Sequence, residues 1–302
     1  MIGPSTSGAL VPANVSFGMF GVGSATAGII DRKIDLYLEY RNWIGGSIPT
    51  IDVATAVSVG DADCMWTIQP SGGPCGAPAS ACVNWPSLIA GQYDAEIVAF
   101  ADWINTSWRR PLYVRFAHEA NGTGWYDWQV GGSCGVASAT QWVAGFNRFA
   151  AVLKANSEWP RVVWAVNCGP YDNIVDFYPS ECDIMGLDGY NGLGSWQTDS
   201  EVFGPAYAEV DALDLDKPIW ICEMACTEPS LPWTYDGVTC PVQPQYSKAN
   251  WITTFMANTA YPRLQAWVWF NVEKERNWIV NSSAGSTRAF VQAFTNTGNI
   301  AK

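Results

Sequence analysis

Two glutamates stand where apolar, strand-like runs end. Glu119 closes such a run in PLYVRFAHEANGTGWYDW, and Glu223 closes another in KPIWICEMAC. A charged group at the end of a buried strand is costly unless it is paired or functional. A carboxylic acid that protonates a leaving oxygen, with a carboxylate that attacks an anomeric carbon, is the equipment of glycoside hydrolysis. Spacing alone fits equally well two unrelated glutamates in structural ion pairs.

Strand alternation predicts how the neighbouring side chains point. Arg115 and Glu119 share one direction, while His118 points the other way unless the strand has already ended. Glu223 has the parity of Ile219 and Ile221, which predicts that all three point inward. Catalytic groups of barrel enzymes lie at the C-terminal ends of strands, so both glutamates fit the mouth of a barrel.

His118 is the single histidine of the chain, which restricts other mechanisms. Any Ser-His-Asp or Cys-His mechanism must use it, as must any histidine-ligated metal. The sequence has no acidic cluster at metal-binding spacing. We therefore expect no metal and no cofactor.

The elements that position these residues follow an alternating pattern. Short β-rich runs alternate with segments of helical period, which predicts a parallel sheet with helices outside it. With 302 residues, the chain fits one α/β domain over 1–302, a single (β/α)8 TIM barrel. We expect strands at 16–22, 51–57, 65–68, 112–118, 162–167, 184–188, 219–223 and 266–271, with 40–44 as an alternative second strand. We expect helices at 30–40, 95–106, 140–154, 201–213, 247–258 and 286–294.

Composition excludes several classes of partner. The formal net charge of −12 disfavours nucleic acid and anionic membranes, which an acidic surface repels. No segment approaches the roughly 20 apolar residues of a membrane span. The 17 Trp, 12 Tyr and 12 Phe exceed what a core needs, and aromatic faces stack well on sugar rings. These features favour a polysaccharide or oligosaccharide partner and a monomeric protein.

Nine cysteines indicate an oxidising compartment. We expect a secreted protein, with any signal peptide absent from this sequence. An odd total predicts four disulfides and one free thiol, for which Cys222 is the candidate. Local spacing suggests the pairs Cys226–Cys240 and Cys75–Cys82.

Several motifs together resemble glycoside hydrolase family 26. Arg115, His118-Glu119, Asn121-Gly122 and the cluster Trp125-Tyr126-Asp127-Trp128 look like the family's acid/base strand, R-x-x-H-E-x-N-G followed by aromatics. Further matches follow in the family's order: Val163 to Asn167, Asp183 to Asn191, Glu223, and Trp267 to Asn271. The likeness covers about residues 91–294.

The resemblance implies the role of each matched residue. Glu119 is expected to be the acid/base and Glu223 the nucleophile. The remaining candidates bind the sugar or support the carboxylates: His118, Arg115, Trp125, Trp128, Asn167, Asp188, Tyr190 and Trp269. Of these, His118 is expected to contact the sugar in the −1 subsite, Tyr190 to hydrogen-bond the nucleophile, and Trp269 to form the floor beneath that sugar. For Arg115, holding the nucleophile ionised and filling the barrel with a paired charge are equal alternatives.

The function expected from these residues is a retaining endo-β-1,4-mannanase that works by double displacement. The same chemistry on mixed-linkage β-glucan, β-1,3-xylan or another microbial wall polysaccharide is the closest alternative. An inactive carbohydrate-binding barrel is a rival of another class, although both carboxylates are present. The chain departs from the family pattern at Ala120 and at Met224-Ala225-Cys226, which we expect to lie beside the subsites that select the sugar.

Overall fold

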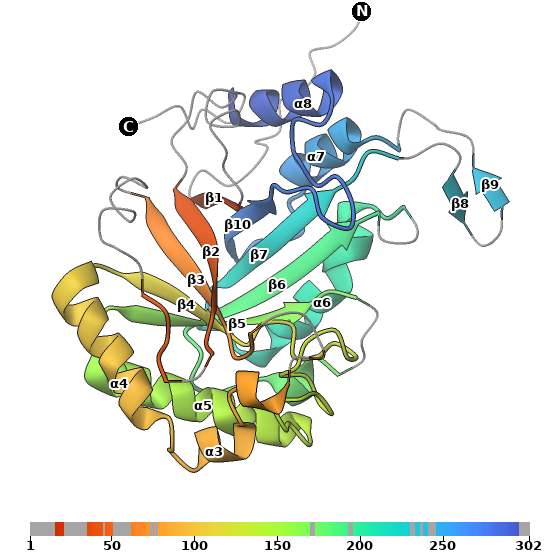
Figure 1. Cartoon of the computed structure of the whole chain (residues 1–302). Helices are drawn as coiled ribbons and strands as arrows, with labels where there is room; N and C mark the ends of the chain where they lie inside the picture. Colours follow the sequence, from red (N-terminus) through yellow and green to blue (C-terminus); the bar gives the residue numbers. More distant parts are fainter. Residues whose placement is uncertain are drawn as a thin grey trace, which may run out of the picture.

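Eight parallel strands close into a barrel in the order β1-β10-β7-β6-β5-β4-β3-β2, which confirms the expected (β/α)8 class. The computed structural model describes residues 16–20, 35–44, 46–50, 62–72, 76, 78–169, 173–192, 196–229, 233–235, 238–240 and 246–295. The barrel strands are β1 (Ser16–Phe20), β2 (Leu36–Asn42), β3 (Asp63–Gln69), β4 (Leu112–Phe116), β5 (Pro160–Asn167), β6 (Ile184–Asn191), β7 (Ile219–Cys226) and β10 (Leu264–Phe270). Figure 1 shows them side by side, curled around a common axis.

Helices cover the outside of the barrel (Figure 1). They are α3 (Trp85–Ile89), α4 (Asp94–Trp103), α5 (Ala139–Asn156), α6 (Asp199–Leu213), α7 (Lys248–Ala257) and α8 (Ala284–Thr295). The segments η1 (Ala79–Ala81), η2 (Ile104–Trp108) and η3 (Val175–Phe177) are short helical turns, and β8 (Trp233–Tyr235) pairs with β9 (Val238–Cys240). The long helices begin at hydroxyl side chains: Ser138 caps α5, Ser247 caps α7, and Thr198 forms a capping box with Glu201 at α6.

The core has two layers, as the barrel geometry requires. Small and medium side chains, among them Ala165, Ala266 and Val268, fill the barrel interior. Bulkier side chains pack between the strands and the helices. Ten tryptophans are almost completely buried, so most of the aromatic content belongs to the core.

Most of the predicted elements are confirmed, and one is wrong. The helices expected from 95–106 onward all form, with shifted ends. In place of the helix expected over 30–40, residues 36–42 form β2, which pairs with β3 along its whole length. The alternative second strand at 40–44 overlaps the end of β2. The strand expected at 51–57 lies outside the described residues.

The expected disulfides are not present in the described part of the chain. Seven of the cysteines there carry free thiols, including Cys82 and Cys226, which were expected to pair with Cys75 and Cys240. Cys222 is therefore one free thiol among several in this part of the chain. Among the described residues, no group of three or more His, Cys, Asp or Glu side chains is arranged to hold a metal ion. None of the described helices is both long and apolar enough to cross a membrane.

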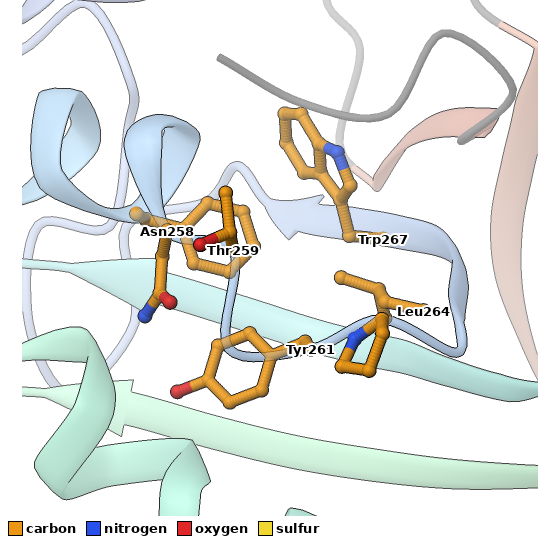
Figure 2. Close-up of a pocket in the computed structure, with 7 residues that line it drawn as sticks. Asn258, Thr259, Tyr261, Leu264 and Trp267 are labelled. Atoms are coloured by element: carbon orange, nitrogen blue, oxygen red, sulfur yellow. The ribbon is translucent and has the colours of Figure 1, made fainter. Parts of the chain in front are cut away.

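A cavity of about 260 Å³ lies between the end of α7 and the start of β10. Its lining residues are Phe255, Asn258, Thr259, Tyr261, Pro262, Leu264 and Trp267. Figure 2 shows Trp267 and Leu264 on the β10 side, with Asn258, Thr259 and Tyr261 opposite them. The loop that lines it enters β10, so the cavity lies at the N-terminal side of the strands. It is therefore separate from the catalytic mouth, which barrels form at the C-terminal ends.

Candidate active site

Glu119 lies just beyond β4, where the backbone leaves the extended conformation. The strand ends at Phe116, and Ala117 and Glu119 have φ angles of 48° and 53°, in the left-handed region. Non-glycine residues rarely adopt this conformation, and such strain concentrates at functional sites. The Glu119 N–H donates to the Ala165 carbonyl at 2.8 Å, which fixes the turn against β5. Strand alternation therefore does not extend to His118, the exception allowed in the prediction.

The Glu119 carboxyl group accepts one hydrogen bond on each oxygen. Asn167 Nδ2 donates to Oε1 at 2.9 Å, and Trp125 Nε1 donates to Oε2 at 2.9 Å. Burial, followed by the nearby charge of Glu223, raises the pKa of Glu119 to about 7, although both donors and Arg115 oppose the rise. Glu119 therefore keeps a proton up to neutral pH, as a general acid requires.

The loop after Glu119 is folded around one glutamine side chain. Gln129 Oε1 accepts from the N–H groups of Gly124 at 2.8 Å and Trp125 at 2.9 Å, while its Nε2 donates to the Glu119 carbonyl at 2.7 Å. Trp128 Nε1 donates to the His118 carbonyl at 2.8 Å. These bonds hold the loop from which Trp125 donates to the Glu119 carboxyl group, and Trp128 is buried beneath it.

A β-bulge turns Glu223 into the barrel mouth. Ile221 pairs with Leu187, but the next residue of β6, Asp188, pairs with Glu223, so Cys222 is an extra residue. Ile221 packs outward against the helices, whereas Cys222 belongs to the barrel interior. The parity argument is therefore wrong: Glu223 and Ile221 point to opposite faces, and the bulge gives Glu223 and Cys222 the same direction.

Three donors converge on the Glu223 carboxylate. Arg115 Nη2 and the Tyr40 hydroxyl both donate to Oε1, and the Tyr190 hydroxyl donates to Oε2. A carboxylate offers about four lone-pair positions, so three are occupied and the open one lies on Oε2. Burial, and then the charge of Glu223, raise the pKa of Tyr40 and Tyr190 well above the usual range, so both hydroxyls remain donors.

Arg115 supplies the positive charge at the centre of the site. Its side chain is fully buried and bonds Asp188 through Nη1, at 2.9 Å to each carboxylate oxygen. Nε donates to Thr67 Oγ1 at 2.8 Å, and Nη2 reaches Tyr40 at 3.2 Å as well as Glu223. Arg115 therefore pairs with two buried carboxylates, Asp188 and Glu223.

His118 is a neutral imidazole at the edge of the site. Burial, together with Arg115 and Lys274, lowers the pKa of His118 well below its usual range. Nε2 lies 3.2 Å from the Tyr126 hydroxyl, and the ring packs edge-on against Tyr40. Nδ1 is buried and has no hydrogen-bond partner among the residues that the structure describes.

Trp269 does not lie at the mouth, contrary to the expected sugar floor. Its side chain is fully buried and packs against Trp251 of α7 and Phe290 of α8, on the helix side of β10. Ala266 and Val268 of β10 fill the interior, whereas Trp267 and Trp269 face the helices. Phe270 and Trp278 lie next to Tyr190 instead, with ring centroids at 5.7 and 5.1 Å.

A buried lysine fixes the loop that carries Trp278. Lys248 Nζ donates to the carbonyls of Asn277 at 3.1 Å and Ile279 at 2.8 Å, and to Ser282 Oγ at 2.8 Å. Burial lowers the pKa of Lys248 to about 8. Lys248 thus holds the loop between β10 and α8. Trp278 of this loop packs against Tyr190, which contacts Glu223.

The structure brings together nine of the ten predicted site residues. Around the two glutamates lie His118, Arg115, Trp125, Trp128, Asn167, Asp188 and Tyr190, and Trp269 alone is placed elsewhere. Tyr40 and Gln129 were not predicted from the sequence, and Tyr126 was placed in the aromatic motif without a role. Tyr40 belongs to the alternation Leu36, Leu38, Tyr40, which is the signal of a strand. The residues that depart from the family pattern, Ala120 and Met224-Ala225-Cys226, are all fully buried.

Comparison with known proteins finds one curated relative along most of the chain. No family model matches the chain. It is 29% identical over 277 residues to Endoglucanase H of Acetivibrio thermocellus, an alignment that covers 87% of this chain and 27% of that protein. The chain therefore spans about a quarter of the length of this curated relative.

Solved structures with the same fold include family 26 mannanases. The Bacillus subtilis mannanase BCman matches with a TM-score of 0.61 at 16% identity, over 93% of this chain and 86% of that one. The GH26 β-mannanase BoMan26A of Bacteroides ovatus matches with a TM-score of 0.60 at 14% identity, over 94% and 90%. At these identities the likeness shows the fold.

The fold and the site define a glycosidase-type (β/α)8 barrel with two buried glutamates at its mouth. Within that class its motif order resembles that of glycoside hydrolase family 26, and the solved structures of the same fold include a GH26 β-mannanase.

Proposed function

We propose that the chain is a retaining endo-β-glycanase that hydrolyses β-1,4-mannan, with Glu119 as acid/base and Glu223 as nucleophile. The observation that carries the proposal is the contrast between the two carboxyl groups. Glu119 has a pKa raised to about 7 and one donor on each oxygen, whereas Glu223 accepts from three donors, one of them a guanidinium. Retaining glycosidases need this division of labour between two carboxyl groups.

In the first step, Glu223 Oε2 attacks the anomeric carbon while Glu119 transfers its proton to the leaving glycosidic oxygen. Each Glu119 oxygen accepts one bond, so the proton occupies a remaining lone pair. The bonds from Tyr40 and Arg115 to Oε1 hold the carboxylate so that its other oxygen faces the sugar. This orientation lowers the barrier by positioning the nucleophile before the reaction starts.

In the second step, the roles of Glu119 reverse. After it has lost its proton, the carboxylate accepts a proton from water, which attacks the glycosyl-enzyme and releases Glu223. Ionised Glu119 is stabilised by the N–H groups of Asn167 and Trp125, which already point at its oxygens. Configuration is retained because two displacements occur at the same carbon.

The polymer is the finer part of the proposal. The solved structures of similar fold are named mannanases, which supports mannan. The curated relative at 29% identity is named an endoglucanase, which supports mixed-linkage β-glucan as a second candidate. The mannose units of mannan and the glucose units of β-glucan differ in the configuration at C2. Hydrogen bonds to the hydroxyl group on this carbon strengthen in the transition state.

Parallel assays on β-1,4-mannan, mixed-linkage β-glucan, β-1,3-xylan and a sample of microbial wall polysaccharide distinguish these substrates. The first is expected to be cut most efficiently, with a viscosity loss that precedes the rise in reducing ends, as endo action requires. Glu119→Gln and Glu223→Gln are the matched controls and should be inactive on all four. Equal inactivity of the wild-type protein on all four polymers would instead support the carbohydrate-binding barrel.

A further inference from the structure

The segment after β3 and the segment after β4 meet at Pro70. The Pro70 carbonyl accepts from Val83 N–H at 2.9 Å and from Cys134 Sγ at 3.3 Å. The Trp85 N–H donates to the Cys134 carbonyl at 2.8 Å. The segment that follows β3 and the segment that follows β4 are therefore tied together here, with Cys82 in the first and Cys134 in the second.

The two cysteine side chains meet where these segments meet. Cys82 and Cys134 share a side-chain hydrogen bond. Cys134 is fully buried, and Cys82 is 8% exposed. The backbone of Cys82 forms an antiparallel β-bridge with that of Ser71. The backbone of Cys134 is held by the Trp85 N–H, so both cysteines are fixed in place.

We propose that Cys82 and Cys134 form a disulfide that joins the β3–α3 and β4–α5 loops. The oxidant is a small-molecule disulfide. The Cys82 thiolate attacks one of its sulfurs, breaks the S–S bond and releases one small thiol. The Cys134 thiolate then attacks Cys82 Sγ and releases the second. Two cysteines are oxidised, one small disulfide is reduced, and the two cysteine protons end on the released thiols.

Burial governs when the bond forms. It raises the pKa of both Cys82 and Cys134, so few thiolates exist in the folded protein at neutral pH. Oxidation therefore belongs to folding, before the two segments close over the cysteines. Once formed, the bond is shielded from external thiols for the same reason.

The disulfide would restrict the movement of the segment after β4, which holds the backbone of Glu119 in place. The Cys134 N–H donates to the Asp127 carbonyl at 2.9 Å, and Gln129, two residues further, holds the Glu119 carbonyl. A link between residues 82 and 134 closes a loop of 52 residues (134 − 82). Such a loop lowers the entropy of the unfolded chain and stabilises the folded state.

Peptide mapping of protein refolded in a glutathione redox buffer tests the proposal. Trypsin leaves Cys134 alone in residues 116–148, and it leaves Cys64, Cys75 and Cys82 together in residues 42–109. We expect these two peptides to be linked. The link should persist in Cys75→Ala and disappear in Cys82→Ala, which identifies the partner. Alkylated Cys134 in the refolded wild type, or a link that survives Cys82→Ala, would overturn the proposal.

Thermal melting supplies an independent measurement. Reduction should lower the Tm of the refolded wild type by about 5 °C or more. Cys134→Ala should show no such shift, whereas Cys182→Ala, which removes another buried thiol, should retain it. A shift that persists in Cys134→Ala would contradict the proposed bond.

Discussion

The proton on Glu119 is held by burial and by the charges around it. Arg115 supplies one positive charge, which Asp188 and Glu223 already share. Ionisation of Glu119 adds a further negative charge to this buried group, and the pKa of Glu119 rises to about 7. The proposed acid and the proposed nucleophile are therefore distinguished by their partners, although both are glutamates at strand ends.

The pH profile of kcat/KM follows from this placement. We expect activity to fall above about pH 7, because Glu119 loses the proton that it must transfer. In Trp125→Phe, loss of a donor that stabilises ionised Glu119 should move the basic limb to higher pH. A basic limb that moves to lower pH would contradict the assigned hydrogen bond.

Tyr40 tests the network on the nucleophile. Tyr40→Phe removes one of the donors to Glu223 Oε1, and kcat/KM should fall about ten- to a hundredfold. Tyr37→Phe is the matched control on the same strand and should retain nearly full activity. Equal effects of the two substitutions would remove Tyr40 from the site.

At the scale of elements, sequence patterns predicted the strands better than the directions of their side chains. The alternation of strands and helices from residue 95 onward gave the correct elements, because each run is long and regular. The directions of Ile219 and Ile221 were misjudged because the bulge at Cys222, which separates their parity from that of Glu223, has no signature in an unbroken apolar run. Trp269 was assigned to the mouth by resemblance, although the small Ala266 and Val268 mark the inner face of β10.

Because Trp269 is buried against two helices, its substitution is expected to lower the stability of the folded protein. Trp269→Ala leaves a large cavity between β10 and the helices α7 and α8, so the free energy of unfolding should fall by about 3–5 kcal/mol. Trp125→Ala is the contrasting variant, because its indole is partly exposed beside Glu119 and its loss should chiefly lower kcat/KM. Chemical denaturation with kinetics on the folded fraction separates the two effects. A stable Trp269→Ala with poor turnover would restore the platform role.

At the scale of the whole molecule, the raised pKa of Glu119 makes the stability of the folded state depend on pH. Folded Glu119 has a pKa of about 7, against 4.5 for a free glutamate, so the folded state binds the extra proton between these values. Its contribution to stability is thus complete below pH 4.5 and is lost as the pH rises to 7. A shift of this size corresponds to about 3 kcal/mol.

Glu119→Gln should reveal this cost. The amide does not titrate, so the variant should gain stability over the wild type as pH rises from 5 to 8, by about 3 kcal/mol in the free energy of unfolding. Urea denaturation at the two pH values measures the change, with Glu201→Gln on the exposed start of α6 as a control. A constant difference between Glu119→Gln and the wild type would show that Glu119 has no raised pKa.

Azide rescue of the two alanine variants tests the assignment of the glutamates most directly. On an aryl glycoside with a good leaving group, Glu119→Ala should form the glycosyl-enzyme and then stall, because no base activates water. Azide needs no deprotonation, so it should restore turnover and yield a β-glycosyl azide. Glu223→Ala forms no such intermediate, so it should yield no β-azide, and any direct attack by azide on the substrate would give the α-azide. If Glu223→Ala instead gave the β-azide and Glu119→Ala did not, the roles of the two glutamates would be reversed.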